Sequence, residues 1–249
     1  MKEVNAAIIT IGDELLIGQT IDTNSAFIAQ ELNKIGIWVK RRIAVGDVKE
    51  EILNALKEQS RDCEVIIITG GLGPTADDIT KPALCEYFGS TLIVDEGALQ
   101  NVKDIFTKLN RPLIERNLRQ AEVPDNCDVL PNKKGTAPGM WFGSGGQGPI
   151  YISLPGVPNE MKGLMRDSVI SKLKETFELP VVTHRTLLTS GIGESMIADH
   201  IADFENNLPP HIKLAYLPAY GMVRLRLTAR GESKDTMELD HLFHQLKFL

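Results

Sequence analysis

Two uninterrupted runs of apolar residues most strongly constrain the fold of this chain. Residues 6–11 read AAIITI and residues 65–69 read VIIIT, and a glycine follows each run. A strand that is apolar at every position has to be covered on both faces, as the strands of parallel sheets are. Segments with apolar residues at helical spacing follow both runs, and this alternation predicts an α/β fold with a parallel, doubly wound sheet.

The segments between and after these strands fit the same alternation. Phe27, Ile28, Leu32 and Ile35 fall on one face of a predicted helix that Gly36 can end. Further strands are predicted at residues 37–46, 91–94, 132–142 and 149–158, the last two joined by the turn 143–148. Further helices are predicted after Asp47, at about 77–88, after Asp95 and at about 159–177.

The last 70 residues read as a second, smaller unit. Residues 178–180 resemble a linker, so we expect an α/β domain over 1–177 and a small α+β domain over 181–249. In this second domain we predict strands at 183–191, 213–221 and 222–231, and helices at 194–204 and 236–246. The chain stops inside the last helix, so either that helix is the true end or the domain is truncated.

Composition and charge exclude several classes of protein. The chain has 249 residues, of which 43% are hydrophobic, and a formal net charge of −6, which argues against nucleic-acid and membrane-surface partners. Its three cysteines are scattered and form no CxxC pair, and its short N-terminal apolar run resembles neither a signal peptide nor a membrane span. We therefore expect a cytoplasmic protein. All five histidines lie at or beyond residue 184, and without an HExxH motif we expect solvated side chains rather than a zinc site.

The stretch 64–80, EVIIITGGLGPTADDIT, places a glycine-rich turn after the most apolar strand. The backbone N–H groups of Gly70, Gly71 and Gly73, with the N-terminus of a following helix, predict a site for an anion. Asp77 and Asp78 would repel a bare pyrophosphate there. This pairing favours a bound divalent cation, because carboxylates and substrate phosphates together are typical ligands of Mg²⁺.

Two other interpretations of this stretch stay open. The aspartates could simply cap the helix and offset its dipole. Alternatively, Gly71, Gly73 and Ala76 satisfy the dinucleotide-binding pattern GxGxxA, with Asp95 near the spacing expected for its acidic residue. That second interpretation would require the turn to follow the first strand of its sheet, whereas here it follows the third.

Acidic and basic residues also follow other predicted strands. Asp13 and Glu14 come directly after the first strand, at the edge of the sheet where ligands bind in open α/β folds, although a solvated loop would read the same way. Lys134 precedes a turn of small residues and could contact a phosphate, or could belong to an ordinary hairpin. Pro155 and Gly156 form another strand-to-helix turn that permits close approach.

Four stretches in this order resemble one family. They are TIGDELLIGQTIDTNS, TGGLGPTADDIT, GTAPGM and LPGVPNEM. Together they are similar to the N-terminal part of the competence/damage-inducible protein CinA family, whose first domain is shared with molybdopterin-binding proteins of the MoaB, Mog and MoeA types. GIGES and KLAYLPAYGMVRLRLTARG resemble the small linking domain of CinA. The resemblance implies a three-layer α/β sandwich with a mostly parallel sheet, followed by a KH-like α+β domain.

The resemblance also implies chemistry at a phosphoanhydride. CinA-type domains are associated with metal-dependent hydrolysis of ADP-ribose to AMP and ribose 5-phosphate, which implies Mg²⁺, Mn²⁺ or Co²⁺ as cofactor. We assign Asp78, with Asp77 or Asp13, to the cation, and Glu14 or Asp47 to the general base, because Asp47 resembles an acidic position of the Mog relatives. The residues assigned to the substrate are Gly70, Gly71, Gly73, Thr75, Lys134, Gly135, Thr136, Pro155 and Gly156.

Two further hypotheses belong to other classes. The MoaB and Mog relatives imply molybdopterin binding or adenylyl transfer, and a non-catalytic binding domain is the third possibility. The deamidase domain that longer CinA proteins carry for nicotinamide mononucleotide is absent from this sequence, so we do not expect that activity unless the chain is a fragment whose missing part supplies it. A homo-oligomer is expected, with a nucleotide diphosphate or a pterin as the small-molecule partner.

Overall fold

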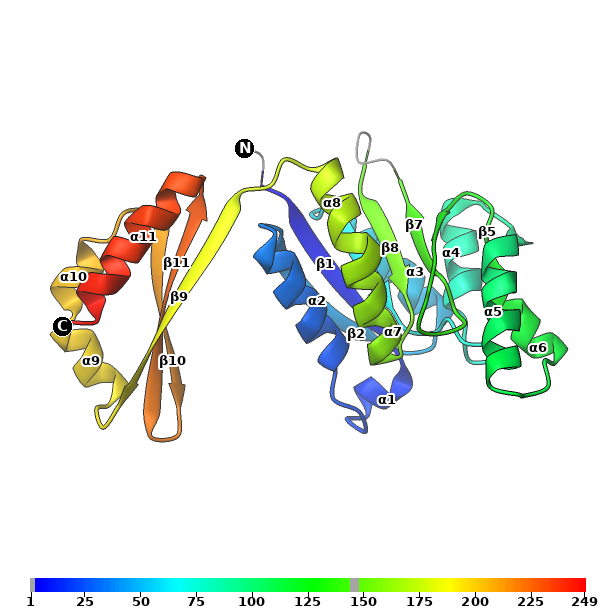
Figure 1. Ribbon diagram of the computed structural model, residues 1–249, viewed down its shortest axis with the longest axis horizontal. Coiled ribbons are helices and arrows are strands. Elements are labelled where there is room, and N and C mark those ends of the chain that lie inside the picture. Colours follow the sequence, from blue (N-terminus) through cyan, green and yellow to red (C-terminus); the bar gives the residue numbers. More distant parts are fainter. Residues whose placement is uncertain (1–2, 144–147) are drawn as a thin grey trace. The chain divides into compact units, whose positions relative to one another are not determined.

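The chain divides into two compact units in a computed structural model that describes residues 3–143 and 148–249 (Figure 1). Among the described residues, the smaller unit comprises Leu179–Leu249 and the short segment Lys34–Gly36, and the larger unit comprises the others. No helix of the described residues is both long and apolar enough to cross a bilayer. Cys63, Cys85 and Cys127 are free thiols, as expected from their spacing.

A six-stranded sheet with the order β2-β1-β3-β8-β7-β6 forms the centre of the larger unit. Its first four strands are parallel, and β7 and β6 run antiparallel to their neighbours. The strands are β1 (Asn5–Ile11), β2 (Trp38–Val45), β3 (Val65–Thr69), β6 (Asp128–Leu130), β7 (Gly139–Phe142) and β8 (Ile150–Leu154). The predicted turn between β7 and β8 includes residues 144–147, which lie outside the described residues.

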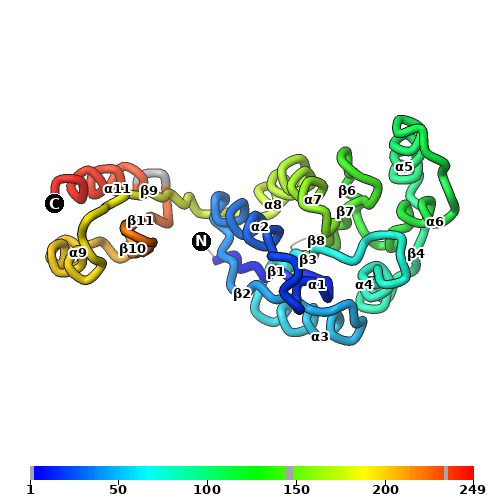
Figure 2. Tube along the Cα trace, turned by 90° about the horizontal axis from the view of Figure 1, so that it is seen from below, coloured from blue at the N-terminus to red at the C-terminus, as the bar shows by residue number. Residues whose placement is uncertain are grey.

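Helices cover both faces of this sheet, which gives three layers (Figure 2). One layer contains α2 (Thr23–Lys34), α7 (Pro158–Leu164) and α8 (Ile170–Thr176), with a π-helical turn, Met165–Val169, between the last two. The other contains α3 (Lys49–Gln59) and α4 (Thr80–Phe88). The short helix α1 (Asp13–Leu16) follows β1 directly.

The apolar runs form the interior strands, as predicted. Every residue of β3 and of β8 is buried, and so is every residue of β1 after Asn5. The expected α/β sandwich with a mostly parallel sheet is therefore confirmed.

Several predicted elements differ from the structure. The strand expected at 132–142 is restricted to Gly139–Phe142, and the strand expected at 149–158 ends at Leu154, with Pro158 already in α7. The helix expected at 77–88 begins only at Thr80, so Asp77 and Asp78 belong to the preceding loop and not to a first helical turn. The strand expected at 91–94 is β4 (Leu92–Val94), which leaves the main sheet and pairs with β5 (Glu122–Pro124) in a separate ribbon. All three residues of β4 are exposed, although Leu, Ile and Val are typical of a core strand. This ribbon connects with α5 (Glu96–Lys108), α6 (Glu115–Leu118) and the 3₁₀ turn Arg119–Ala121.

The smaller unit is an antiparallel sheet with the order β10-β11-β9, covered on one face by helices (Figure 1). Its strands are β9 (Val181–Ser190), β10 (Ile212–Ala219) and β11 (Met222–Gly231), and its helices are α9 (Glu194–His200), α10 (Ala202–Asn206) and α11 (Ser233–Leu246). Alternate residues of β11 are buried, and Val223, Leu225 and Leu227 pack with Ile197 of α9 and Leu239 of α11. One apolar face and one polar face explain why the sequence of this strand alternates.

A pair of isoleucines tests which strands form the core. Ile67 of β3 is fully buried, whereas Ile93 of β4 is 48% exposed. We expect Ile67→Ala to lower the free energy of unfolding of the larger unit by about 3 kcal/mol, because it leaves a cavity, and Ile93→Ala to lower it by less than about 1 kcal/mol. Both tryptophans, Trp38 and Trp141, lie in the larger unit, so their fluorescence during denaturation reports on that unit. Equal losses in the two variants would contradict the assignment.

Candidate functional site

The loops that leave four adjacent parallel strands meet at one edge of the sheet. Asp47 follows β2, Asp13 and Glu14 follow β1, the glycine-rich loop follows β3, and Pro155 and Gly156 follow β8. Since parallel strands end on the same side, the carboxyl ends of β2, β1, β3 and β8 bring these predicted residues to one region. The order of the strands, rather than the order of the sequence, decides which loops are neighbours.

Asp13 and Asp47 hold each other in place through their backbones. The N–H of Asp13 donates to Oδ2 of Asp47 at 3.0 Å, and the N–H of Asp47 donates to Oδ1 of Asp13 at 3.1 Å. Gly46 makes room for this contact, because a side-chain carbon there would lie 2.7 Å from Oδ1 of Asp13. The loops after β1 and β2 are thus fastened together by the two carboxylates assigned to a cation and a general base.

Three carboxylates from two other loops act electrostatically on Asp47. Burial raises the pKa of Asp47, and the negative charges of Asp13, Glu14 and Asp77 raise it further, while the N–H of Asp13 lowers it. No ion pair joins any of these four to a lysine or arginine among the described residues. A group of carboxylates that lacks a basic counterpart favours a divalent cation, and its oxygen donors suit Mg²⁺ or Mn²⁺.

Asp78 closes the glycine-rich loop on itself. Its Oδ1 accepts from the N–H of Gly73 at 2.7 Å, and its Oδ2 accepts from the N–H of Thr75 at 2.9 Å and from the Thr75 hydroxyl. Both oxygens are therefore engaged within the loop. The assignment of Asp78 to a cation and to catalysis remains a prediction. A phosphate bound by Gly73 and Thr75 would have to compete with Asp78 for their N–H groups.

The start of this loop is tightly constrained by its two glycines. Gly70 has φ +116°, and a side chain there would overlap the carbonyl oxygen of Ile11 in β1. Gly71 has φ +63°, and a side chain there would overlap the hydroxyl of Thr80. The Thr80 hydroxyl donates to the carbonyl of Gly70 at 2.9 Å. Only glycine allows this close approach between β1, the loop and α4.

Asn24, which was not assigned from the sequence, connects the end of β3 with the loop after β8. Its Nδ2 donates to the carbonyl of Gly156 at 2.7 Å and to Oγ1 of Thr69 at 3.3 Å, and Thr69 Oγ1 donates to the carbonyl of Pro155 at 2.9 Å. At Gly156, a side-chain carbon would lie 3.3 Å from the Cα of Gly70. The predicted substrate residues at the ends of β3 and β8 are therefore in contact, with an amide side chain from α2 beside them.

The predicted lysine loop is held by a different set of residues. Asn132 Nδ2 donates to the carbonyl of Ala137 at 2.8 Å and to Oε2 of Glu160 at 2.6 Å, and Asn132 Oδ1 accepts from the N–H of Lys134 at 3.0 Å. Burial raises the pKa of Glu160. A side chain at Gly135 would overlap this carboxyl group, so that glycine is required by packing.

These contacts do not join Lys134, Gly135 and Thr136 to the four carboxylates. The stem of Lys134 lies instead against α7, where a side-chain carbon at Gly163 would be 2.9 Å from Lys134 Cδ. Contact of Lys134 and Thr136 with a phosphate remains a prediction.

Lys81 is a buried base that the sequence did not reveal. It lies in the first turn of α4, is 6% exposed, and its Nζ donates to the carbonyl of Gln120 at 2.9 Å. Burial lowers its pKa to about 8, and the negative charges of Glu122 and Asp78 act in the opposite direction. A lysine at the start of a helix usually indicates a solvated side chain, and only the packing of α4 against residues 119–122 shows otherwise.

Comparisons with known proteins agree with this architecture. Residues 7–175 match the family profile described as "Probable molybdopterin binding domain", and residues 184–243 match "Damage-inducible protein CinA KH domain". The larger unit is thus an α/β domain of the molybdopterin-binding type, and the smaller one is a KH domain of the CinA type. The chain belongs to the CinA family, which confirms the resemblance read from its motifs.

Its relatives show how much of a CinA-like protein is present. A CinA-like protein of Flavobacterium psychrophilum is 50% identical over 94% of this chain, and one of Cytophaga hutchinsonii is 48% identical over 95%. This chain spans 56% of the length of each. A crystal structure described as CinA with unknown function from Thermoplasma acidophilum is 35% identical, with a TM-score of 0.61 over 68% of this chain and 98% of that one.

Asp78→Asn tests the loop-closing contacts. An amide NH₂ in place of Oδ2 cannot accept from Thr75, so we expect a loss of about 1–3 kcal/mol in the free energy of unfolding and faster amide exchange at Gly73 and Thr75. Asp77→Asn is the matched control, because Asp77 is fully exposed and its neighbour carries the loop contacts. Hydrogen exchange at these two amides measures the effect, and an equal effect of Asp77→Asn would contradict the role given to Asp78.

The lowered pKa of Lys81 predicts how the free energy of unfolding depends on pH. The folded state releases the Lys81 proton at about pH 8, whereas the unfolded chain keeps it to about 10.5. Between these values the unfolded state binds more protons, so the contribution of Lys81 makes the free energy of unfolding rise with pH, by about 3 kcal/mol in total. Denaturation of Lys81→Met between pH 7 and 10.5 should lack this rise, and Lys57→Met, at an exposed position of α3, should keep it. Parallel curves for Lys81→Met and the unmodified protein would rule out a buried, titrating Lys81.

Proposed function

We propose that this chain hydrolyses the phosphoanhydride bond of ADP-ribose with the help of a divalent cation, releasing AMP and ribose 5-phosphate. The observation that carries the proposal is the convergence of Asp13, Glu14, Asp47 and Asp77 beside a glycine-rich turn. A diphosphate brings two negative charges to such a region. A cation held by the carboxylates would allow the diphosphate to bind beside them, since it offsets the negative charges of both groups.

Carboxylate oxygens are suitable ligands for such a cation, but among the described residues no three of these carboxylates place their oxygen atoms within 4.8 Å of one another. Asp13 and Asp47 each use one carboxylate oxygen on the backbone N–H of the other, so the second oxygen of Asp13 is left for the cation and the second oxygen of Asp47 is left to accept a proton. Asp77 is exposed in the neighbouring loop. When bound, Mg²⁺, Mn²⁺ or Co²⁺ would offset phosphate charge and acidify a water molecule.

Asp47 is the residue best suited to receive a proton. Its raised pKa reflects partial burial and three neighbouring negative charges, and a carboxylate of this kind is a stronger base than a solvated one. In the proposed reaction a water oxygen attacks one phosphorus, the bond to the bridging oxygen breaks, and the water proton passes to Asp47 or Glu14. The bridging oxygen leaves with the other phosphate, which yields AMP and ribose 5-phosphate.

A second candidate function rests on the family match. The profile over residues 7–175 describes a probable molybdopterin-binding domain, and a pterin with its phosphate could occupy the same strand ends. Adenylyl transfer onto such a pterin would also act at a phosphoanhydride, with the pterin phosphate in place of water. A non-catalytic binding domain is the third alternative.

Hydrolysis of ADP-ribose by the purified chain tests the first proposal. We expect AMP release that requires Mg²⁺, Mn²⁺ or Co²⁺, and we expect Asp47→Asn to lower kcat by about 10²–10⁴-fold, because the variant lacks the proton acceptor. Asp104→Asn, on the exposed surface of α5, is the matched control and should retain full activity.

Thermal shifts separate the alternatives if no AMP appears. A ligand that binds only the folded state raises Tm, so a rise with molybdopterin and none with ADP-ribose would favour the pterin-binding function. A rise with ADP-ribose but no hydrolysis would leave a binding domain. Full activity of Asp47→Asn would remove this residue from the mechanism.

A further inference from the structure

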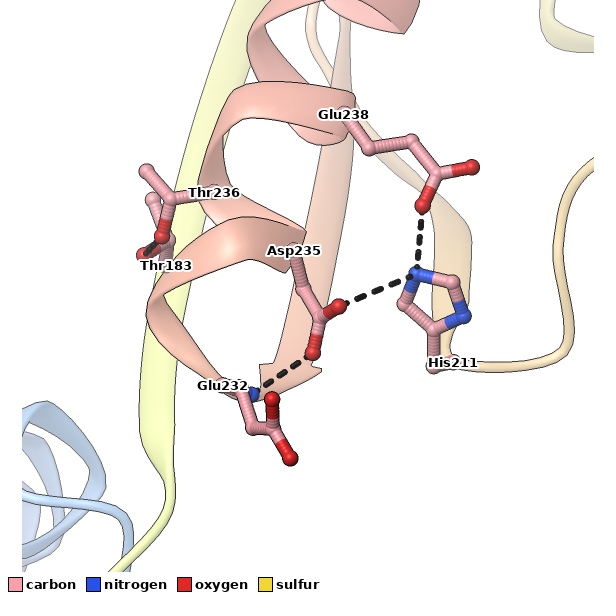
Figure 3. A network of polar contacts seen from close by, with 6 residues as sticks. All are labelled: Thr183, His211, Glu232, Asp235, Thr236 and Glu238. Atoms are coloured by element: carbon pink, nitrogen blue, oxygen red, sulfur yellow. Dashed lines mark hydrogen bonds and ion pairs between the residues drawn. The ribbon is translucent and has the colours of Figure 1, made fainter.

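A histidine and two carboxylates meet in the smaller unit, far along the sequence from the residues discussed above. His211 precedes β10, and Asp235 and Glu238 lie one turn apart near the start of α11 (Figure 3). His211 Nε2 lies 2.9 Å from Oε2 of Glu238 and 3.9 Å from Oδ1 of Asp235. One nitrogen and two oxygens of these side chains all lie within 4.8 Å of one another.

The Asp235 carboxylate is fixed in the orientation that such a group needs. Its Oδ2 accepts from the backbone N–H of Glu232 at 2.6 Å, while its Oδ1 faces His211. A side chain at Gly231 would overlap Oδ2 of Asp235, so the glycine at the end of β11 lets the carboxylate sit against the backbone. The Asp235 side chain is only 15% exposed. The cluster therefore has one rigid oxygen donor, and Glu238, at 46% exposed, is the adjustable one.

We propose that His211, Asp235 and Glu238 bind a divalent transition-metal cation of the Zn²⁺ type. Ligand atoms at 2.0–2.1 Å from one tetrahedral ion lie about 3.3 Å from one another, and the two distances from His211 Nε2 fall on either side of that value. An imidazole nitrogen with two carboxylates is a donor set for Zn²⁺, Mn²⁺ or Co²⁺, whereas Ca²⁺ and Mg²⁺ prefer oxygen alone. One position on the ion remains for water.

The site would fasten two elements of the smaller domain. His211 directly precedes β10, which is an edge strand of the sheet. The two carboxylates belong to α11, the helix that covers one face of this sheet. The cation would offset the two negative charges that now face the ring. It would also join residues separated by more than 20 positions of chain, so its binding should stabilise the domain by mass action. None of this depends on the function proposed for the larger unit.

The distribution of histidines makes the test selective. His184, His200, His211, His241 and His244 are all of the histidines, and none belongs to the larger unit. Titration of the purified chain with ZnCl₂, followed by NMR of the imidazole nitrogens, therefore reports only on the smaller unit. We expect Nε2 of His211 to shift at micromolar Zn²⁺ while the other four rings change little.

Variants decide between a metal site and an ordinary hydrogen bond. We expect His211→Gln and Glu238→Gln each to weaken Zn²⁺ binding at least about tenfold, since each removes one ligand. His241→Gln, on the same helix, is the matched control and should bind as the unmodified chain does. Glu238→Gln changes a half-exposed residue, so it tests the proposal even if His211→Gln fails to fold. No shift at His211 below millimolar Zn²⁺, a shift centred on His241 and His244, or unchanged binding by Glu238→Gln would each overturn the proposal.

Discussion

Coverage of the central sheet on both faces is the constraint on which the rest of the larger unit depends. The interior strands β1, β3 and β8 are buried almost throughout, so they have no solvated face that could carry a charged side chain. Charged groups can only be placed where these strands end. The parallel direction of four neighbouring strands then brings four ends together, and this arrangement explains why so many of the acidic and glycine-rich motifs meet in one region.

The sequence predicted this layout because it depends on patterns that a strand or helix carries along its own length. Continuous apolar runs identified β1 and β3. Predictions failed where the structure of a segment depends on contacts with residues outside that segment. The letters of β4 resemble a core strand, but its place is decided by pairing with β5, some 30 residues later. The start of α4 was misplaced because Asp78 bonds backward to Gly73 and Thr75 instead of capping a helix.

The candidate site shows the same division. Asp13, Asp47, Gly70 and Gly156 follow strands directly, so their positions could be predicted from strand order. Asn24 and Lys81 lie on helices, and their contacts with the loops after β3 and β8 and with residues 119–120 depend on how those helices pack. The sequence also did not predict the cluster of His211, Asp235 and Glu238, because no short motif relates a residue before a strand to a helix 24 residues further on.

The reciprocal bonds between Asp13 and Asp47 have a mechanical consequence. Each carboxylate is a possible ligand and also accepts a hydrogen bond from the backbone of the other residue. Two equivalent hydrogen bonds therefore join the two loops. A ligand that binds only the carboxylate oxygens outside these two hydrogen bonds leaves both bonds intact, so the site is already formed before the ligand binds. A ligand that draws one carboxylate away breaks one of the two hydrogen bonds, and the other bond still joins the turns after β1 and β2.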